Sequence, residues 1–371
     1  MGFFSGQIQY LIDSGFDVAV ICSPGWHNET AAQYYPLAME REISLGKDFV
    51  SLIRLIKLLV TLKPDSVCAG TPKASFLAGI AAFVARVPVR VYMCLGLRLE
   101  TTKGWKRNVL LITERVTSAC ATRIWCISQS VKNRLLELGL ADPRKIDLLG
   151  YGSVNGIDLK KFQLYQTMGE RDALLKKHSI PPNSFVIGFV GRLTKDKGVP
   201  EALLAFNELK QTFDNIFLVL VGSFEAGDPL PEQTLELIHR DQRVILTGFV
   251  TTVKDYYHLF DLLWLPSHRE GMGDVLLEAA ASGLAVVACR TTGIIDVVDD
   301  GKTGFLVPVG DSTLLAERTK LLLLDRALAI KMGQEARRSV EQRFNQQKVW
   351  EGMKNYQQGL LKQVYKRDYM H

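Results

Sequence analysis

Short apolar runs alternate along residues 184–308 with segments whose apolar positions recur every three or four residues. The runs are FVIGFV (185–190), IFLVLVG (216–222), VILTGFV (244–250), LLWLP (262–266), LAVVACR (284–290) and GFLVP (304–308). Continuous hydrophobicity is typical of strands that are buried on both faces. The helical spacing of EALLAFNELK (201–210) and DVLLEAAAS (274–282) predicts the helices that cover them. We therefore expect a doubly wound α/β domain with a parallel sheet.

Residues 1–165 repeat this rhythm less regularly. Strands are predicted at 17–23, 65–70, 89–94, 123–128 and 145–149, and helices near 5–14, 48–62, 73–86, 105–119 and 129–138. A doubly wound domain normally begins with a central strand, whereas this chain opens with a loop followed at once by a helix. We therefore expect the first strand to be missing and the N-terminal sheet to have a slot in its middle.

A length of 371 residues is too large for one compact core and suits two domains. We place the first domain at 1–165 and the second at 166–345, because the region around Pro181-Pro182 interrupts the regular pattern. The final segment, 346–371, is polar and aromatic, and its Trp and Tyr residues predict a helix that docks on the first domain.

Composition narrows the class of protein. With 47% apolar and 23% charged residues, the chain has the composition of a soluble globular protein. This composition excludes an extensively disordered protein. No apolar stretch approaches the ~20 residues that cross a bilayer. The six cysteines lack metal-binding spacing, so we expect reduced core thiols in a cytoplasmic protein. The net charge of +6 is modest and no aromatic-basic platform is visible, so no nucleic-acid partner is expected.

The segment PSHREGMGDVLLEAAASG (266–283) follows a predicted strand and opens a predicted helix near Asp274. Ligands of open α/β sheets bind beyond the carboxyl ends of the strands, where glycines let them approach the backbone. A helix start attracts anions, so a diphosphate fits this terminus. Glu270 and Glu278 then lie on either side as acceptors for sugar hydroxyls. The alternative is that Glu278 faces solvent on an ordinary helix.

The segment FVGRLTKDKGVPEALLAF (189–206) carries two cations between a strand and a helix. The strand ends at Gly191, Arg192 and Lys197 follow, and Pro200 opens the helix. Arginine offers a planar, forked guanidinium and lysine a mobile ammonium group. This pair of cations is expected where phosphates bind without a metal ion to offset their negative charge. A solvated basic loop is the alternative, and the origin of both segments at one sheet edge favours binding.

With Gly191-Arg192-Leu193, Lys197 and the Glu-x7-Glu spacing of Glu270 and Glu278, the chain resembles a retaining glycosyltransferase of family 4. The resemblance covers nearly the whole chain. It implies the α/β GT-B fold, with two Rossmann-like doubly wound parallel-sheet domains facing a cleft and a C-terminal helix returning to the N-terminal domain. It also implies sugar transfer from a nucleoside diphosphate sugar, expected to be a UDP-sugar, with no metal and no cofactor.

The resemblance assigns roles in the second domain. Arg192 and Lys197 bind the donor diphosphate and Glu270 contacts the donor sugar, so these three are the expected catalytic residues. Glu278 holds the ribose hydroxyls. The other expected donor-binding residues are Gly248, Val250, Gly271, Met272 and Gly273. Retention in this family resembles a front-face reaction, in which the departing phosphate oxygen helps to take the acceptor proton.

The N-terminal half is similar to the subgroup that builds capsule, exopolysaccharide or O-antigen in bacteria. Its motifs are Gly2-Phe3-Phe4-x-Gly6-Gln7, Ser23-Pro24-Gly25, Met39-Glu40-Arg41-Glu42-Ile43, Thr71-Pro72-Lys73-Ala74 and Gly96-Leu97-Arg98-Leu99-Glu100. An isoprenoid diphosphate-linked sugar is the implied acceptor. The expected acceptor-binding residues are Gly2, Phe3, Lys73, Arg98 and Glu100. The protein is then expected in the cytoplasm, peripheral on the inner face of the plasma membrane.

The charge distribution bears on that membrane expectation. Residues 1–165 hold 20 basic against 13 acidic residues, so the basic excess is N-terminal. Lys103, Lys106 and Arg107 suit acceptor phosphates or anionic headgroups, although a solvated basic face is the alternative. The apolar stripe of helix 48–62 suits either a bilayer or, as such stripes more commonly do, core packing.

Two departures from the family pattern leave alternatives open. Leu95 stands where related chains often have His or Arg, and leucine can neither hydrogen-bond nor titrate. The first strand is also expected to be missing. A truncated or degenerate nucleotide-sugar-binding protein without activity is therefore one alternative, and a nucleotide-sugar epimerase is another. Of the histidines, His27 is a weak catalytic candidate, and structural roles are expected for His178, His239, His258 and His268.

Overall fold

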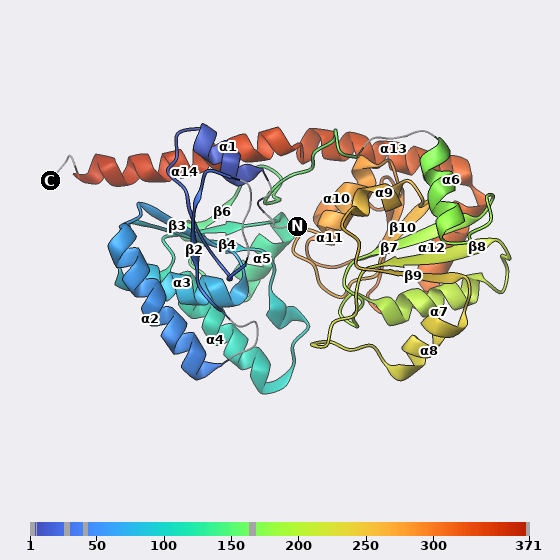
Figure 1. Cartoon of the computed structure of the whole chain (residues 1–371), viewed down its shortest axis with the longest axis horizontal. Helices are drawn as coiled ribbons and strands as arrows, with labels where there is room; N and C mark the ends of the chain where they lie inside the picture. The colour runs from blue at the N-terminus through green and yellow to red at the C-terminus, as the bar shows by residue number, and fades with distance from the viewer. Residues whose placement is uncertain (1–3, 5, 26–29, 40–43, 163–167, 369–371) are drawn as a thin grey trace. The chain divides into compact units, whose positions relative to one another are not determined.

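A computed structural model describes residues 4, 6–25, 30–39, 44–162 and 168–368 of the chain. The chain divides into two compact units (Figure 1). Unit 1 contains residues 1–156 and 346–371, and unit 2 contains residues 157–345. The packing boundary thus lies between Gly156 and Ile157, and the C-terminal segment belongs to the first unit.

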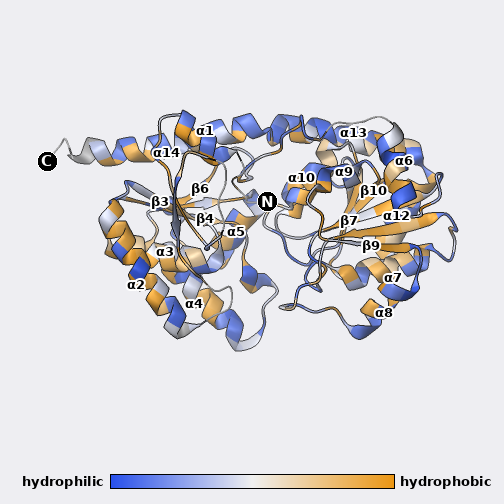
Figure 2. Ribbon diagram, in the orientation of Figure 1, coloured by the Kyte–Doolittle hydropathy of each residue, from blue (hydrophilic) through white to orange (hydrophobic). Residues whose placement is uncertain are grey.

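The described part of unit 2 forms a parallel sheet in the order β12-β11-β10-β7-β8-β9. Its strands are β7 (Phe185–Val190), β8 (Ile216–Val221), β9 (Val244–Gly248), β10 (Leu262–Leu265), β11 (Val286–Cys289) and β12 (Gly304–Val307). All were predicted from their apolar runs, and Figure 2 shows the central strands in hydrophobic colour. The chain adds β8 and β9 on one side of β7 and then continues with β10 on the other. The direction of winding therefore switches between β7 and β10.

Helices cover both faces of this sheet. They are α6 (Met168–Lys177), α7 (Val199–Leu209), α8 (Glu232–Arg240), α9 (Val253–Tyr257), α10 (Asp274–Ala281), α11 (Ile294–Val297), α12 (Ser312–Leu324) and α13 (Arg326–Arg343). Ile187 and Phe189 point from β7 into a core shared with Phe206 of α7. The residue between them, Gly188, faces Phe260, whose ring a Cβ would approach to 2.3 Å. Only glycine lets that ring lie directly on the strand.

The described strands of unit 1 form two separate parallel sheets, β1-β2 and β3-β4-β5-β6. They are β1 (Ala19–Cys22), β2 (Gln33–Pro36), β3 (Ser66–Ala69), β4 (Val89–Cys94), β5 (Arg123–Cys126) and β6 (Ile146–Leu148). β2 was not predicted, because its four residues form no continuous aliphatic run and end in a proline, which is uncommon inside a sheet. Among the described residues no strand lies between β1 and β3 and pairs with both. This arrangement agrees with the expected slot in the middle of the N-terminal sheet.

The helices of unit 1 are α1 (Gln7–Asp13), α2 (Leu45–Leu62), α3 (Pro72–Val84), α4 (Gly104–Cys120), α5 (Gln129–Glu137) and α14 (Gln346–Asp368), with 3₁₀ turns η1 (Arg98–Glu100) and η2 (Pro143–Lys145). Figure 1 shows α2, α3 and α4 on one side of the β3–β6 sheet and α1 with α14 on the other. No helix among the described residues has the length and hydropathy needed to cross a bilayer.

The predicted docking of the C-terminal helix is confirmed. The indole of Trp350 donates a hydrogen bond of 2.7 Å to Asn155, and its ring packs against Tyr10. Further along α14, Tyr356 donates to Asp147 at 2.7 Å. These aromatic residues combine an apolar body with a polar end, so they anchor a largely polar helix on unit 1.

The expectation that the cysteines are core thiols holds only in part. All six are free, and Cys94, Cys126 and Cys289 are buried. Cys68 contradicts the expectation, because it lies exposed on β3. The apolar run around it predicted a buried strand, but β3 lies at the edge of its sheet.

Candidate active site

The two strand-end segments meet in the structure. The loop after β7 carries Lys197, the loop after β10 carries Glu270, and the two side chains form an ion pair. β7 and β10 are paired neighbours, and the winding of the sheet switches between them. Ligands of open α/β sheets bind at such a switch point. The side chains are 17% and 13% exposed, so the pair is largely shielded from solvent.

Glycines allow the backbones of these loops to approach each other closely. Gly198 caps α7 at φ +75°, and a Cβ there would lie 2.0 Å from the carbonyl oxygen of Pro266. Gly273 caps α10 in the same left-handed region. Gly293, which precedes α11, lies against the backbone of Gly271. A side chain at Gly198 or Gly293 would meet the backbone of the neighbouring loop, so these two close approaches depend on glycine.

Three further glycines adjoin at the ends of β7, β8 and β9. The Gly222 amide donates to the Gly248 carbonyl at 3.1 Å, and a Cβ on Gly222 would lie 1.8 Å from the Gly191 carbonyl oxygen. Arg192 follows this cluster, is about half exposed and pairs with Glu225. The predicted positions Gly248 and Val250 therefore share one sheet edge with Arg192 and Lys197.

Glu278 lies one turn into α10 and is held from α9. The phenol of Tyr257 donates a hydrogen bond of 2.6 Å to its carboxylate. Burial raises the pKa of Glu278 to about 7, and the bond from Tyr257 acts in the opposite direction. The alternative of a Glu278 that simply faces solvent is therefore wrong. Between Glu278 and Glu270, Asp274 lies within electrostatic range of both Glu270 and Lys197.

Residues outside the ion pair also connect the two loops, and of these Arg269, Asp196 and Glu201 were not predicted from the sequence. Arg269 bonds Asp196 at 2.9 Å, and the ring of His268 contacts Glu201 of α7 at 2.8 Å. The hydrogen bond to Glu201 raises the pKa of His268. The expected structural role of His268 agrees with this contact. Its place in the chain, two residues before Glu270, was the available signal.

Three buried hydroxyls at this edge have no hydrogen-bond partner among the described residues. They belong to Thr194 after β7, Ser267 after β10 and Thr291 after β11. Buried hydroxyls are normally paired, and each exception requires an explanation such as water or a ligand. No three His, Cys, Asp or Glu side chains gather in a possible metal site within the described ranges.

The predicted acceptor residues lie in unit 1 and are not brought into one cluster. Lys73, at the start of α3, forms an ion pair with Asp48 at 2.5 Å. Glu100 pairs with Arg134 at 3.5 Å. Arg98 is exposed on η1. Gly2, Phe3 and the candidate His27 lie outside the described residues. Lys73, Arg98 and Glu100 nevertheless follow the carboxyl ends of the paired strands β3 and β4.

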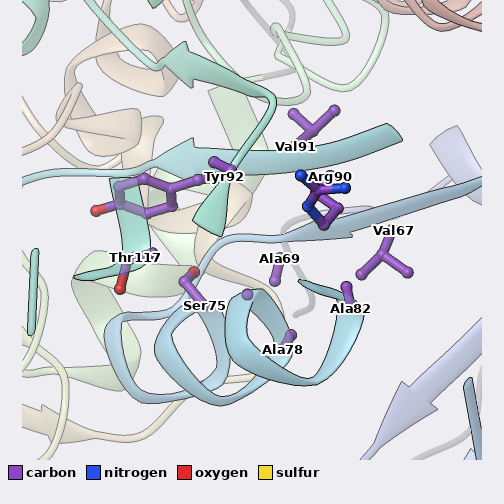
Figure 3. A pocket seen from close by; sticks show the side chains of 11 residues that line it. Val67, Ala69, Ser75, Ala78, Ala82, Arg90, Val91, Tyr92 and Thr117 are labelled. Carbon is purple, nitrogen blue, oxygen red and sulfur yellow. The ribbon is translucent and has the colours of Figure 1, made fainter. Parts of the chain in front are cut away.

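A small cavity in unit 1 lies apart from these positions. Figure 3 shows it between α3 and the strands β3 and β4, lined by small apolar side chains with Ser75, Tyr92 and Thr117. Its volume of about 10 Å³ holds no more than a water molecule. The Ser75 hydroxyl is buried without a partner among the described residues. This cavity is too small to receive a sugar.

Two protein families, one for each half of the chain, together match most of its length. The family described as glycosyl transferases group 1 matches residues 170–339, which hold the paired loops and Glu278. The family described as glycosyl transferase 4-like domain matches residues 4–152.

Individual relatives extend over nearly the full length. The chain is 37% identical over 363 residues to the capsular polysaccharide biosynthesis glycosyltransferase CapM of Staphylococcus aureus, covering 96% of this chain and 94% of the relative. It is 29% identical over 350 residues to the UDP-Gal:alpha-D-GlcNAc-diphosphoundecaprenol alpha-1,3-galactosyltransferase of Escherichia coli, covering 91% and 88%.

Solved structures share the fold. The sucrose-phosphate synthase of Thermosynechococcus elongatus matches with a TM-score of 0.78 at 19% identity, over 99% of this chain and 93% of that chain. WaaG, a glycosyltransferase involved in lipopolysaccharide biosynthesis, matches with a TM-score of 0.76 at 17% identity, over 95% and 94%. Anabaena HepE in complex with UDP and glucose matches with a TM-score of 0.72 at 22% identity, over 89% and 86%.

Proposed function

The chain belongs to the group 1 glycosyl transferases, and on that premise we propose that it moves a sugar from a UDP-sugar to an isoprenoid diphosphate-linked saccharide with retention of configuration. It is a glycosyltransferase with the GT-B fold. The observation that carries the finer proposal is the meeting of Lys197 and Glu270 at the switch point of the unit 2 sheet. A cation and a carboxylate there suit a ligand with both phosphates and hydroxyls.

The donor diphosphate binds between the basic loop and the start of α10. Arg192 and Lys197 face its phosphates, and the backbone amides of the first turn of α10, after Gly273, add donors. The positive charge stabilises the leaving diphosphate as the bond to the sugar breaks. Glu270, Gly271 and Met272 contact the sugar, Glu278 accepts from the ribose hydroxyls, and Gly248 and Val250 receive the base. The relative from Escherichia coli, whose name includes UDP-Gal, supports a UDP-sugar.

No divalent metal takes part in the proposed reaction, because the two cations supply the positive charge that a metal otherwise provides. Arg192 forms an ion pair with Glu225, and Lys197 forms one with Glu270. A diphosphate competes with these carboxylates for the same cations. Binding of the donor therefore exchanges an internal ion pair for a phosphate contact, and frees Glu270 to accept from the sugar.

The acceptor is a sugar on an isoprenoid diphosphate, and the reaction belongs to capsule, exopolysaccharide or O-antigen synthesis. The names of the two relatives, one capsular and one acting on a diphosphoundecaprenol-linked sugar, support this assignment. Gly2, Phe3, Lys73, Arg98 and Glu100 are proposed to contact the acceptor. The enzyme then works in the cytoplasm as a peripheral protein on the inner face of the plasma membrane.

Transfer assays test the proposal. The full chain is incubated with UDP-glucose, UDP-galactose or UDP-N-acetylglucosamine and an undecaprenyl diphosphate-linked sugar, and the product linkage is read by NMR. We expect an α-linked product from one α-linked donor, at the same rate in EDTA. An inverted product, or a rate lost in EDTA and restored by Mg²⁺, would contradict retention or metal independence.

Two alternatives give different results in the same assay. An inactive, degenerate chain binds UDP by calorimetry without turnover on any acceptor, and Leu95 beside Gly96 motivates this alternative. An epimerase isomerises the donor without an acceptor. The Leu95→His variant discriminates further, because it places a polar, titratable side chain beside Gly96. Transfer gained only by that variant would favour the degenerate chain.

A further inference from the structure

Helices α2, α3 and α4 form one layer on the β3–β6 sheet of unit 1. α3 lies in the middle of the layer and packs against both α2 and α4 (Figure 1). The outward faces of α2 and α4 are therefore the exposed surface of this layer. Outward faces of such helices normally carry polar and charged residues of both signs.

The α2 helix has an apolar stripe on each of two opposite faces. Leu55 and Leu59 are buried, in a core that they share with Leu77 of α3. The opposite face exposes large apolar residues between bases, and Phe49 alone is 63% exposed. The apolar residues of this face are Phe49, Val50, Ile53 and Val60, and the bases beside them are Arg54 and Lys57. Core packing explains only the first stripe.

The outward face of α4 has the same character. Trp105 is 71% exposed at the start of the helix, and Ile112 is exposed two turns later on the same face. Lys106 and Arg115 are exposed beside them. A tryptophan with bases on an amphipathic helix is typical of a helix that rests at a membrane interface.

The acidic residues of α2, α3 and α4 do not lie on the outward faces of these helices. The three helices contain two acidic residues, Asp48 and Glu114. Asp48 is engaged by Lys73, and Glu114 is buried and accepts a hydrogen bond of 2.7 Å from Tyr92. The outward faces of the described helices therefore combine exposed apolar side chains with positive charge alone.

We propose that the outward faces of α2 and α4 dock unit 1 on a bilayer containing anionic phospholipid. The bases attract the headgroups, and the apolar side chains enter the interface between them. A second copy of the same surface would oppose like charges, which disfavours self-association. The inference deepens the proposed function by assigning the surface that meets the membrane, and rests on that function only for the presence of a lipid-linked acceptor.

Vesicle sedimentation of the full chain tests the surface. We expect binding to vesicles of phosphatidylglycerol and phosphatidylcholine, little binding to phosphatidylcholine alone, and a decrease with added salt. The double variant Phe49→Ser, Trp105→Ser should bind at least about tenfold more weakly. The double variant Arg54→Gln, Lys57→Gln loses about fivefold for each base. The matched control is Leu324→Ser, since Leu324 is 68% exposed on α12 of the other unit.

Several results would overturn the inference. They are equal binding to neutral and anionic vesicles, unchanged binding by both double variants, and an equal loss in the Leu324→Ser control. Light scattering that shows a dimer lost in the Phe49→Ser, Trp105→Ser variant would assign the surface to self-association instead. A short-chain, water-soluble acceptor separates the two proposals. Transfer to it should persist in the surface variants, and its absence in the parent chain would count against the proposed function alone.

Discussion

The phenol of Tyr257 donates a hydrogen bond of 2.6 Å to the carboxylate of Glu278, across the contact between α9 and α10. Tyr257 is almost fully buried, with edge-on contacts to Phe162 and Phe260 that fix its ring. Burial raises the pKa of Glu278 to about 7, while the bond from Tyr257 favours the ionised form. The charge of this carboxylate therefore changes near neutral pH.

Replacing Tyr257 with phenylalanine should shift the pH dependence of nucleotide binding. The ionised carboxylate of Glu278 accepts hydrogen bonds from ribose hydroxyls better than the protonated one. UDP affinity should therefore fall below about pH 7 in the parent chain. Loss of the phenol raises the pKa of Glu278 further, so the fall should begin at higher pH in Tyr257→Phe. Calorimetric titration with UDP from pH 5.5 to 8.5 measures both curves.

The control for that experiment is Glu278→Gln, whose UDP affinity should no longer fall through this transition. Identical midpoints for the parent chain and Tyr257→Phe would show that the hydrogen bond does not tune Glu278.

Glu278 should also affect stability. Its pKa rises from an ordinary value of 4.5 to about 7 in the folded protein. Between these values the unfolded chain has lost the proton while the folded chain still holds it, so the free energy of unfolding decreases as pH rises from 4.5 to 7. Urea unfolding of unit 2 at pH 5 and pH 8 should show a smaller decrease in Glu278→Gln than in the parent chain. An equal decrease in both would remove Glu278 as its source.

Replacing Lys197, which pairs with Glu270, should reduce activity strongly and affect the fold less. Lys197→Met removes a cation proposed to stabilise the leaving diphosphate, and kcat/KM should fall by about 10²–10³. Lys195→Met is the matched control, since Lys195 is exposed in the same loop and should keep nearly full activity. Steady-state assays of the two variants with one UDP-sugar compare them directly. Equal losses would mean that only the charge of the loop matters.

Gly198 predicts a structural effect on the same loops. Alanine at this position faces both a φ of +75° and the carbonyl oxygen of Pro266, 2.0 Å from the new Cβ. Gly198→Ala should cost at least about 2 kcal/mol and weaken UDP binding, because the β7 and β10 loops must separate. The melting temperature of unit 2 should fall by about 4–8 °C. Gly169→Ala on α6, with open space at its Cβ, should leave both quantities nearly unchanged.

Burial of both strand faces explains how much of the fold was predictable. β7 and β8 are buried along their full length, so their continuous apolar runs identified them. β2 is a partly exposed strand that ends in Pro36, and no run of apolar residues marks it.

The sequence was sufficient to predict which loops form the candidate site. Parallel strands bring their carboxyl ends to one edge, so the loops that carry Lys197 and Glu270 were expected at the same edge, and the family resemblance implied that both contact one donor. The partners of single side chains were not predictable. The bond from Tyr257 to Glu278 depends on how α9 packs on α10, and periodicity within either helix contains no information about that packing.

The pair of Tyr92 and Glu114 in unit 1 predicts a pH-dependent loss of stability independent of the active site. Burial raises the pKa of Glu114, and the bond from Tyr92 partly offsets this effect. Tyr92→Phe leaves the carboxylate buried without that donor and should cost about 1–3 kcal/mol. The loss should be larger at pH 8 than at pH 5, because ionising Glu114 becomes more costly and a carboxyl with a raised pKa destabilises the fold as pH rises. Denaturant unfolding of Glu114→Gln, which retains an acceptor for Tyr92 but cannot ionise, should lack this pH dependence. A Tyr92→Phe penalty that is equal at both pH values would mean that Glu114 keeps one protonation state from pH 5 to pH 8.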